Sequence, residues 1–227
     1  MKIQQELCDW LASLPNFYLV PLFALNDDDT VKVAERMSKQ HGLQRLICRH
    51  PKMEEAIINI VRDGVKREDW RGLIYIMGKG RGFDEFQFLY VGKAEARGVR
   101  NALSANVKGV DRGGNKGKFV RWGDNLAYHI GDLSQAIFCN KPHAKSSDKY
   151  ISWAQRLFKE ARCLTAKNPL VDMTLHLNDP VSIYVAPWYA DSTNLSGLPS
   201  TLAVVECDLI ALGAQCFGEV ILNSKGV

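Results

Sequence analysis

The residues best placed for chemistry lie between positions 73 and 121, where two tyrosines in strand-like segments are followed by a dense run of cations. Residues 93–121 carry eight Lys or Arg against two acids, a net charge of +6, while the whole chain is +4 and the remainder therefore −2. The cations are Lys93, Arg97, Arg100, Lys108, Arg112, Lys116, Lys118 and Arg121. Concentrated positive charge attracts polyanions such as nucleic acids. A solvated surface with a chance excess of cations is the alternative interpretation.

The tyrosines belong to a predicted β-hairpin. Residues 73–77 and 88–91 are rich in aliphatic and aromatic side chains, and the link between them contains Gly78, Gly80 and Gly82. An alternation of period two places Tyr75 on one face of its strand, and places Tyr90 with Phe88 and Gly92 on one face of the partner strand. We expect both phenols to point to the same side.

A helix is predicted directly after this hairpin, from about residue 94 to 108, with Gly92 ending the strand. Apolar residues at helical spacing would form its buried stripe, and Arg97, Arg100 and Lys108 would lie on the neighbouring face. The glycine-rich basic stretch 109–117 is predicted to be a loop that closes on a nucleic acid. It lacks the spacing of a nucleotide-binding P-loop.

The remaining elements alternate between helix and strand. Helices are expected over residues 2–14, after Asp29, over 51–63, over 125–138 and over 147–165; strands near 17–20 and over 181–186, with an apolar stretch at 43–48. A last long helix opens at Pro199-Ser200-Thr201, carries Glu206 beside its buried stripe, and stops at Gly213.

Composition narrows the class of protein. A chain of 227 residues, 46% hydrophobic, can bury one sizeable core, and we expect one elaborated domain. No apolar run is long enough to cross a bilayer, and Glu6 and Asp9 interrupt any export signal, so a cytoplasmic location is predicted. Six scattered cysteines favour reduced thiols over a zinc site or a disulfide framework.

Five sequence elements then follow one another in a familiar order: Leu73-Ile74-Tyr75, Tyr90-Val91-Gly92-Lys93-Ala94, Arg100, Glu206 and Ile221-Leu222-Asn223. This order resembles the GIY-YIG nuclease superfamily, and the second element is similar to the corresponding turn of excision-repair and homing endonucleases. The resemblance covers roughly residues 72–223. It implies an α/β (α+β) fold in which a small, three-stranded, mainly antiparallel sheet is flanked by helices.

The resemblance also implies roles at a phosphodiester-cleaving site. Glu206 would hold Mg²⁺ or Mn²⁺, and Arg100 would bind the scissile phosphate with its fork of donors. Tyr75 would act as general base or proton relay, aided by the positive charges of Lys93 and Arg97, and Tyr90 would orient water. Gly92 would leave room for the phosphate.

Two further residues have less direct roles. Asn223 is expected to support the backbone of the site through hydrogen bonds. The family often has a histidine one turn after its arginine, where this chain has Ser104; His129 could replace it, although a core or surface histidine is the commoner interpretation. The first glycine of the family name is displaced to Gly72, and the link between the tyrosine strands is longer than usual.

The expected organisation is an extension at 1–71 for DNA recognition or dimerisation, and a nuclease core at 72–227 with an insertion at about 109–178. This arrangement resembles a type II restriction endonuclease acting on DNA as a possible homodimer, without a membrane partner. A structure-selective or toxin-like nuclease and a DNA-binding module without catalysis are the alternatives. A small-molecule phosphotransferase is disfavoured because no phosphate-cradling motif occurs.

Overall fold

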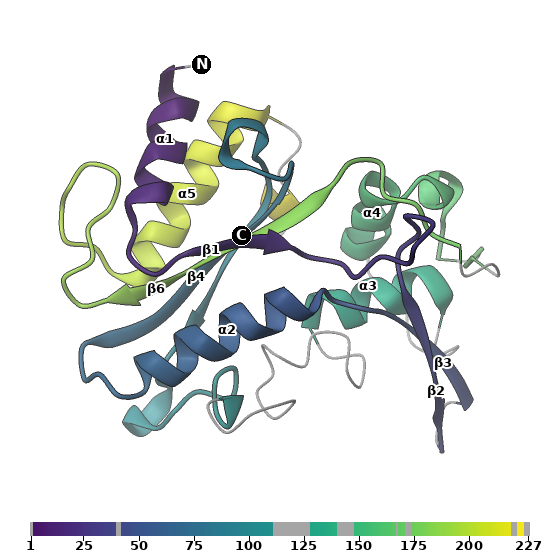
Figure 1. Ribbon diagram of the computed structural model, residues 1–227, viewed down its shortest axis with the longest axis horizontal. Coiled ribbons are helices and arrows are strands. Elements are labelled where there is room, and N and C mark those ends of the chain that lie inside the picture. Colours follow the sequence, from purple (N-terminus) through teal and green to yellow (C-terminus); the bar gives the residue numbers. More distant parts are fainter. Residues whose placement is uncertain are drawn as a thin grey trace. The chain divides into compact units, whose positions relative to one another are not determined.

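The computed structural model describes residues 2–39, 42–110, 128–139, 148–166, 168–170, 174–218 and 222–224. Within these ranges the protein has an α+β fold with five α-helices, a four-stranded antiparallel sheet and a separate two-stranded hairpin (Figure 1). The sheet therefore has one strand more than the three that were expected. The additional strand is β1 (Tyr18–Pro21), which pairs with β6 (Val181–Tyr189).

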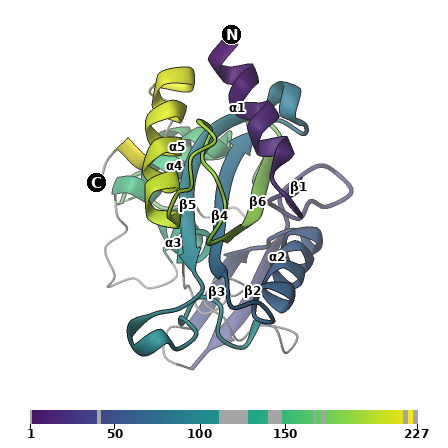
Figure 2. The ribbon, with the colours of Figure 1, turned by 90° about the vertical axis from the view of Figure 1, so that its left-hand side faces the viewer.

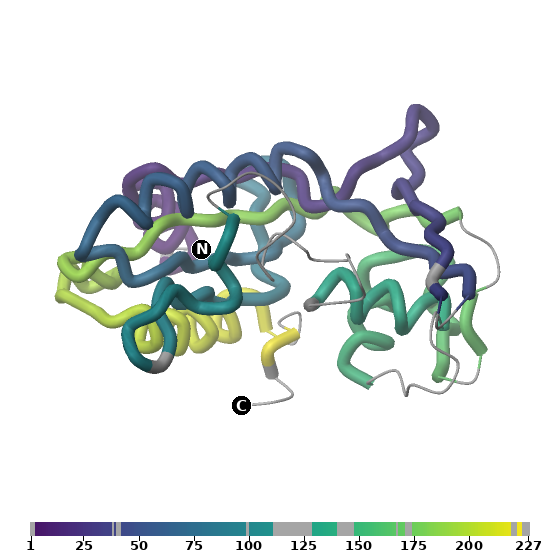
Figure 3. The backbone as a smooth tube through the Cα atoms, turned by 90° about the horizontal axis from the view of Figure 1, so that it is seen from below, coloured from purple at the N-terminus to yellow at the C-terminus, as the bar shows by residue number. Residues whose placement is uncertain are grey.

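The chain forms two compact units, whose backbone path can be followed in Figure 3. Unit 1 comprises Met1–Pro21, Lys52–Val120 and Val181–Val227, and unit 2 comprises Leu22–Pro51 and Arg121–Pro180. Both units thus combine residues from before and after position 71. The tyrosines, Arg100, Glu206 and Asn223 all belong to unit 1, whereas His129 belongs to unit 2.

The sheet of unit 1 confirms the predicted hairpin and places it at one side. Its strand order is β1-β6-β4-β5, with β4 spanning Trp70–Lys79 and β5 spanning Gln87–Glu95, so β5 is an outer strand. Both neighbours of β4 run antiparallel to it. The middle of β4 is aliphatic and aromatic on both faces and almost wholly buried, as expected of a strand covered on two sides.

A β-bulge changes the predicted face of Phe88. Met77 pairs with Tyr90 and the next residue, Gly78, pairs with Phe88, so Leu89 is an extra residue in β5. Phe88 consequently joins the core that contains Ile74 and Ile76, not the face of Tyr90. The strict alternation assumed from the sequence was wrong here because one inserted residue shifts the alternation beyond it.

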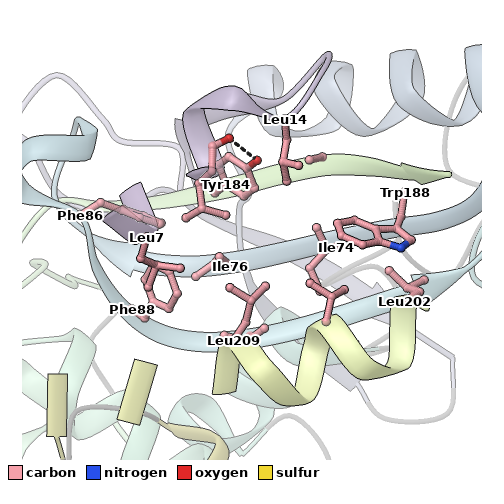
Figure 4. Packing of buried hydrophobic residues seen from close by; sticks show 14 residues of the cluster. Leu7, Leu14, Ile74, Ile76, Phe86, Phe88, Tyr184, Trp188, Leu202 and Leu209 are labelled. Carbon is pink, nitrogen blue, oxygen red and sulfur yellow. Dashed lines mark hydrogen bonds between the residues drawn. The ribbon is translucent and has the colours of Figure 1, made fainter. Parts of the chain in front are cut away.

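Helices α1 (Lys2–Ser13) and α5 (Leu202–Phe217) cover the face of the sheet that carries Ile74 and Ile76. Figure 4 shows their leucines between the helices and the strands, with Trp188 and Tyr184 of β6 in the same layer. Helix α2 (Pro51–Gly64) lies on the opposite side of the sheet from α5 (Figures 1 and 2). Near its end Gly64 admits the ring of Trp70, which would lie 2.4 Å from an added Cβ.

Helix α5 begins where the sequence predicts. Thr201 is its N-cap, and the Thr201 side chain accepts a hydrogen bond of 3.3 Å from the Val204 backbone N–H. The predicted stop at Gly213 is wrong, because the helix continues to Phe217 and Gly218 follows in a positive-φ conformation. Gly213 is buried within the helix.

Unit 2 contains β2 (Val33–Ser38), β3 (Gly42–Ile47), α3 (Tyr128–Phe138) and α4 (Asp148–Leu157). The helix predicted after Asp29 is wrong, because these residues form the antiparallel pair β2–β3. Cross-strand pairing outweighs the helical propensity of alanine, glutamate and arginine in β2. Helix α4 is shorter than predicted and is followed by a 3-10 turn at Glu160–Cys163.

The helix predicted over 94–108 is also wrong. Strand β5 continues to Glu95, and a tight turn follows in which Gly98 N–H donates to Ala102 O at 2.8 Å. The 3-10 segment η2 (Val99–Asn101) forms the tip, where Arg100 has φ 64° and Asn101 has φ 58°. Two consecutive residues in the left-handed region cannot belong to a helix.

None of the helices in the described ranges is both long and apolar enough to span a membrane.

The hydroxyl of Tyr184 provides a test of how α1 is held on the sheet. It donates a buried hydrogen bond of 2.8 Å to the Leu11 carbonyl oxygen of α1 (Figure 4). We expect Tyr184→Phe to lower the free energy of unfolding by about 1 kcal/mol, because one net hydrogen bond is lost. Urea denaturation measures this change; Tyr18→Phe, on the outer strand β1, is the control. Equal midpoints for the two variants would contradict the prediction.

Candidate functional site

Tyr75 and Tyr90 lie together on one face of the β4–β5 hairpin, as predicted. Tyr75 stands opposite Gly92 and Tyr90 stands opposite Met77, and the two ring centroids are 6.1 Å apart at an interplanar angle of 39°. Tyr75 is only 2% exposed, whereas Tyr90 is partly exposed. Of the two phenols, Tyr90 is therefore the one that reaches solvent.

Gly92 makes this pair possible. A Cβ atom added to Gly92 would lie 2.5 Å from both Cζ and Oη of Tyr75 and 2.9 Å from Cε1 of Tyr90. The glycine therefore provides the space in which the rings lie against the strand. Gly92 was expected to end the strand. That prediction is wrong, since β5 extends three residues beyond Gly92.

Lys93 and Glu206 form a second pair, on the other face of the sheet. Lys93 stands opposite Ile74, which belongs to the core beneath α5. The Lys93 ammonium lies 3.8 Å from a carboxylate oxygen of Glu206 on α5 and 3.0 Å from one of Glu95. The expected single pocket is thus divided between two faces: tyrosines on one, and Lys93 with Glu206 on the other.

The electrostatics of this second pair are dominated by burial. Burial raises the pKa of the Glu206 carboxyl above its ordinary value, and the Lys93 charge only partly offsets that rise. Burial alone would lower the pKa of Lys93, but its hydrogen bond to Glu95 and the charges of Glu95 and Glu206 raise that pKa overall. The Lys93 ammonium lies closer to Glu95 than to Glu206 and therefore stabilises the Glu206 charge less. This explains why the pKa values of both Lys93 and Glu206 are raised.

Arg100 does not lie on a helix beside the tyrosines but at the exposed tip of the turn after β5. Arg97 is exposed in the same turn and donates to the Asn101 carbonyl oxygen at 3.0 Å, and Lys108 is exposed further along the chain. Ser104, at the position of the family's histidine, donates a hydrogen bond to the Glu95 carbonyl oxygen and ties the turn to β5. The other predicted cations, Arg112, Lys116, Lys118 and Arg121, lie outside the described residues.

Asn223 supports β5 as the sequence analysis predicts. It lies in the 3-10 segment η7 (Leu222–Ser224), accepts from Val91 N–H at 2.8 Å and donates to Val91 O at 2.7 Å. One amide side chain therefore satisfies both outward-facing backbone groups of a residue between Tyr90 and Gly92. Whether Asn223 takes part in catalysis stays a prediction.

His129 is a core histidine of unit 2. Its Nδ1 lies 2.7 Å from the Tyr150 hydroxyl, and its ring centroid is 5.3 Å from that of Trp153. Burial, reinforced by the charge of Lys149, lowers the pKa of His129 to about 3, so the imidazole is neutral at physiological pH. These contacts agree with the commoner interpretation of His129 as a structural residue.

A groove that no sequence pattern predicted lies beside Glu95, the residue that pairs with Lys93. It has a volume of about 540 Å³ and is lined by Arg71, Glu95, Tyr189 and residues 199–203 at the start of α5. Glu95 thus lines the groove and also binds Lys93. The lining comes from segments far apart in sequence, and no local pattern marks it.

The carboxylates of Glu206 and Glu95 suit a hard divalent cation, which proteins often bind through one or two carboxylates with water and substrate phosphate completing the shell. No cluster of three or more His, Cys, Asp or Glu side chains with metal-binding spacing occurs among the described residues.

Comparison of the chain with models of protein families, with curated proteins and with solved structures found no match.

The tyrosine pair yields a prediction about Gly92. We expect Gly92→Ala to lower the free energy of unfolding by about 1–3 kcal/mol, because the added methyl group must displace the Tyr75 ring. Gly98→Ala is the matched control, since no atom lies within 4 Å of its added Cβ and its φ is not positive. Thermal unfolding compares the two, and a Gly92→Ala variant as stable as the control would contradict this packing.

The second pair predicts a pH effect. Because Glu206 has a raised pKa when folded, stability declines as pH rises from its ordinary value of 4.5 through the raised value. We expect Lys93→Gln to raise the Glu206 pKa further and extend this window upward, since an offsetting charge is lost. Carbon-13 NMR titration of the side-chain carboxyl measures the pKa, and Lys66→Gln, whose ammonium pairs with Asp63 on the surface, is the control. An unchanged or lower Glu206 pKa would refute the assignment.

Proposed function

We propose that this protein is a divalent-metal-dependent endonuclease that hydrolyses DNA phosphodiester bonds, with its active site around the outer strand β5. One observation carries the proposal. Strand β5 holds Tyr90 against Tyr75 on one face and Lys93 against Glu206 on the other, within four consecutive residues. These are the residue types of the GIY-YIG superfamily in its order along the chain.

The position of β5 in the sheet explains how two faces can serve one reaction. Because β5 is outermost, its outer edge is bordered by side chains from both faces. Asn223 covers this edge at Val91, so a phosphate would lie beside the Asn223 segment, with the phenol of Tyr90 on one side and the ammonium of Lys93 on the other. The Asn223 amide keeps this edge fixed through Val91.

In the proposed reaction a water oxygen bonds to phosphorus while a phosphorus–oxygen bond to one sugar breaks. The hydroxyl of the partly exposed Tyr90 orients the water, and the buried Tyr75 holds the Tyr90 ring in position. Lys93 and the guanidinium of Arg100 offset the negative charge that accumulates on the phosphate. The attacking water's proton passes to solvent, and the departing sugar oxygen takes up a proton from solvent.

Glu206, with Glu95 beside it, would hold the metal ion, whose contribution when bound is to neutralise phosphate charge and to lower the pKa of water. The raised pKa of Glu206 indicates a carboxylate whose burial leaves its charge poorly solvated. A bound cation would stabilise such a carboxylate, because it offsets the poorly solvated negative charge.

The finer proposal is a restriction endonuclease acting at a short DNA sequence, as a possible homodimer. A DNA-binding module without catalysis is the second candidate, because the Glu206 carboxylate already faces the Lys93 ammonium and Tyr75 is buried. A structure-selective or toxin-like nuclease would share the same chemistry without sequence preference.

Incubation with supercoiled plasmid tests the proposal. We expect cleavage in Mg²⁺ or Mn²⁺, none in EDTA, and a loss of at least about 100-fold in Glu206→Gln, because removing one electrostatic partner of the transition state costs on this scale. Glu55→Gln, at an exposed position of α2, is the control and should retain full activity.

The products separate the candidates. Discrete fragments support restriction, and a uniform smear supports a nuclease without sequence preference. DNA binding without cleavage in any divalent metal would replace the nuclease proposal with the binding module.

Arg100 offers a variant that removes the side chain without straining the turn. Its φ of 64° suits glycine, so we expect Arg100→Gly to keep or slightly raise stability, by up to about 1 kcal/mol, while lowering cleavage at least about tenfold. Melting temperature and initial cleavage rate measure the two effects. Full activity in Arg100→Gly would exclude Arg100 from the site.

A further inference from the structure

We propose that the β2–β3 hairpin of unit 2 is a DNA-binding arm that enters the major groove of duplex DNA. The groove would face Met37, Leu43, Arg45 and Glu35. The inference deepens the proposed function, on which it rests for the identity of the substrate.

The inner end of the hairpin is firmly held. Ile47 N–H donates to the buried Ser134 hydroxyl of α3 at 3.0 Å, and Ile47 is 2% exposed. The hairpin extends past α3 in Figure 1. A two-stranded ribbon fixed at one end can present its outer end to a partner with little loss of conformational entropy on binding.

The outer end carries an exposed apolar pair. Met37 and Leu43 stand directly opposite each other, and they are 73% and 47% exposed. An exposed methionine beside an exposed leucine contributes little to the fold of the monomer. In the major groove, apolar side chains contact the methyl group of thymine.

Charge selects the partner. Residues 32–49 contain five Lys or Arg and a single acid, a net charge of +4. The cations are Lys32, Arg36, Lys39, Arg45 and Arg49. This density favours a polyanion over a neutral protein surface. An anionic membrane is less suited, because membrane-surface binding requires a large apolar face and only two large apolar side chains are exposed here.

The strand register places two charged side chains that could recognise bases beside the apolar pair. Glu35 stands opposite Arg45, and both share a face with Met37 and Leu43 because side chains two residues apart point the same way. Their side chains pair at 3.3 Å. In the major groove arginine can bind guanine and glutamate can accept from cytosine, so an acid on this face is compatible with DNA.

The dimensions favour the same groove. Two paired strands lie about 4.8 Å apart, and side chains widen the ribbon further. The major groove of B-form DNA, about 12 Å wide, admits a two-stranded ribbon, whereas the minor groove is about 6 Å wide. Double-stranded RNA has a deep, narrow major groove that excludes it.

Binding by the full-length chain tests the arm. Glu206→Gln protein in EDTA is titrated against a fluorescent A·T-rich duplex, and anisotropy gives the affinity. We expect Met37→Ser with Leu43→Ser to weaken binding about tenfold without changing its salt dependence, because the lost contacts are apolar. Leu198→Ser, at a 62% exposed leucine of unit 1, is the matched control and should bind as the parent does.

Two further measurements separate charge from groove. We expect Lys39→Gln to lower the slope of log affinity against log salt by about 0.9, and the exposed Lys66→Gln to leave it unchanged. Replacing thymine by uracil should weaken binding of the parent but not of the Met37/Leu43 double variant, since only the parent contacts the methyl groups. Equal loss in both proteins would overturn the major-groove assignment.

Other occupants give different results. The arm is refuted if the double variant binds DNA like the parent, if it instead converts a dimer to a monomer on size exclusion, or if it loses binding to anionic vesicles and keeps DNA binding. Failure of the arm is distinct from failure of the nuclease. If both the parent and the double variant cut plasmid, the nuclease proposal stands whatever the arm does. If the arm binds DNA but the protein does not cut it, only the arm proposal stands.

Discussion

The close approach of the Tyr75 ring to the backbone of Gly92 is the contact on which the arrangement around β5 depends. A strand residue with any side chain at position 92 would force the Tyr75 ring away from the sheet and with it the neighbouring Tyr90. Because Tyr75 is buried and Tyr90 is partly exposed, the contact fixes a solvent-facing phenol through a solvent-excluded one. Packing of this kind leaves the Tyr90 ring little rotational freedom.

The bulge at Leu89 has an equally local cause and a wider effect. It turns Phe88 into the core beneath α5 and leaves Tyr90 on the opposite face, so one strand contributes side chains both to the core and to the candidate site. The face that carries Lys93 is closed by α5, which places the Glu206 carboxylate where burial disfavours its charge. Packing of α5 against the sheet therefore also sets the electrostatics of the Glu206 carboxylate, and the Lys93 ammonium offsets only part of the cost of burying that charge.

Sequence patterns predicted those parts of the fold in which local preference and tertiary contacts agree. The hairpin of β4 and β5, the cap at Thr201 and the pairing of the two phenols follow from strand propensity, capping chemistry and alternation. Patterns failed where distant contacts decide: β2 is a strand because β3 pairs with it, and residues 96–104 form a turn although their apolar spacing is helical. Alternation along β5 places Lys93 on the face opposite Tyr90, but the position of Glu206 beside Lys93 depends on which helix covers that face, and no local pattern gives this.

The bond between Asn223 and Val91 joins residues separated by 132 positions. During synthesis, β5 can pair with β4 as soon as both have left the ribosome, but its outer backbone groups at Val91 stay open until residue 223 has been made. An outer strand with unsatisfied groups is a template for pairing with other chains. The edge of β5 at Val91 is therefore available to chaperones or to aggregation until Asn223 pairs with Val91.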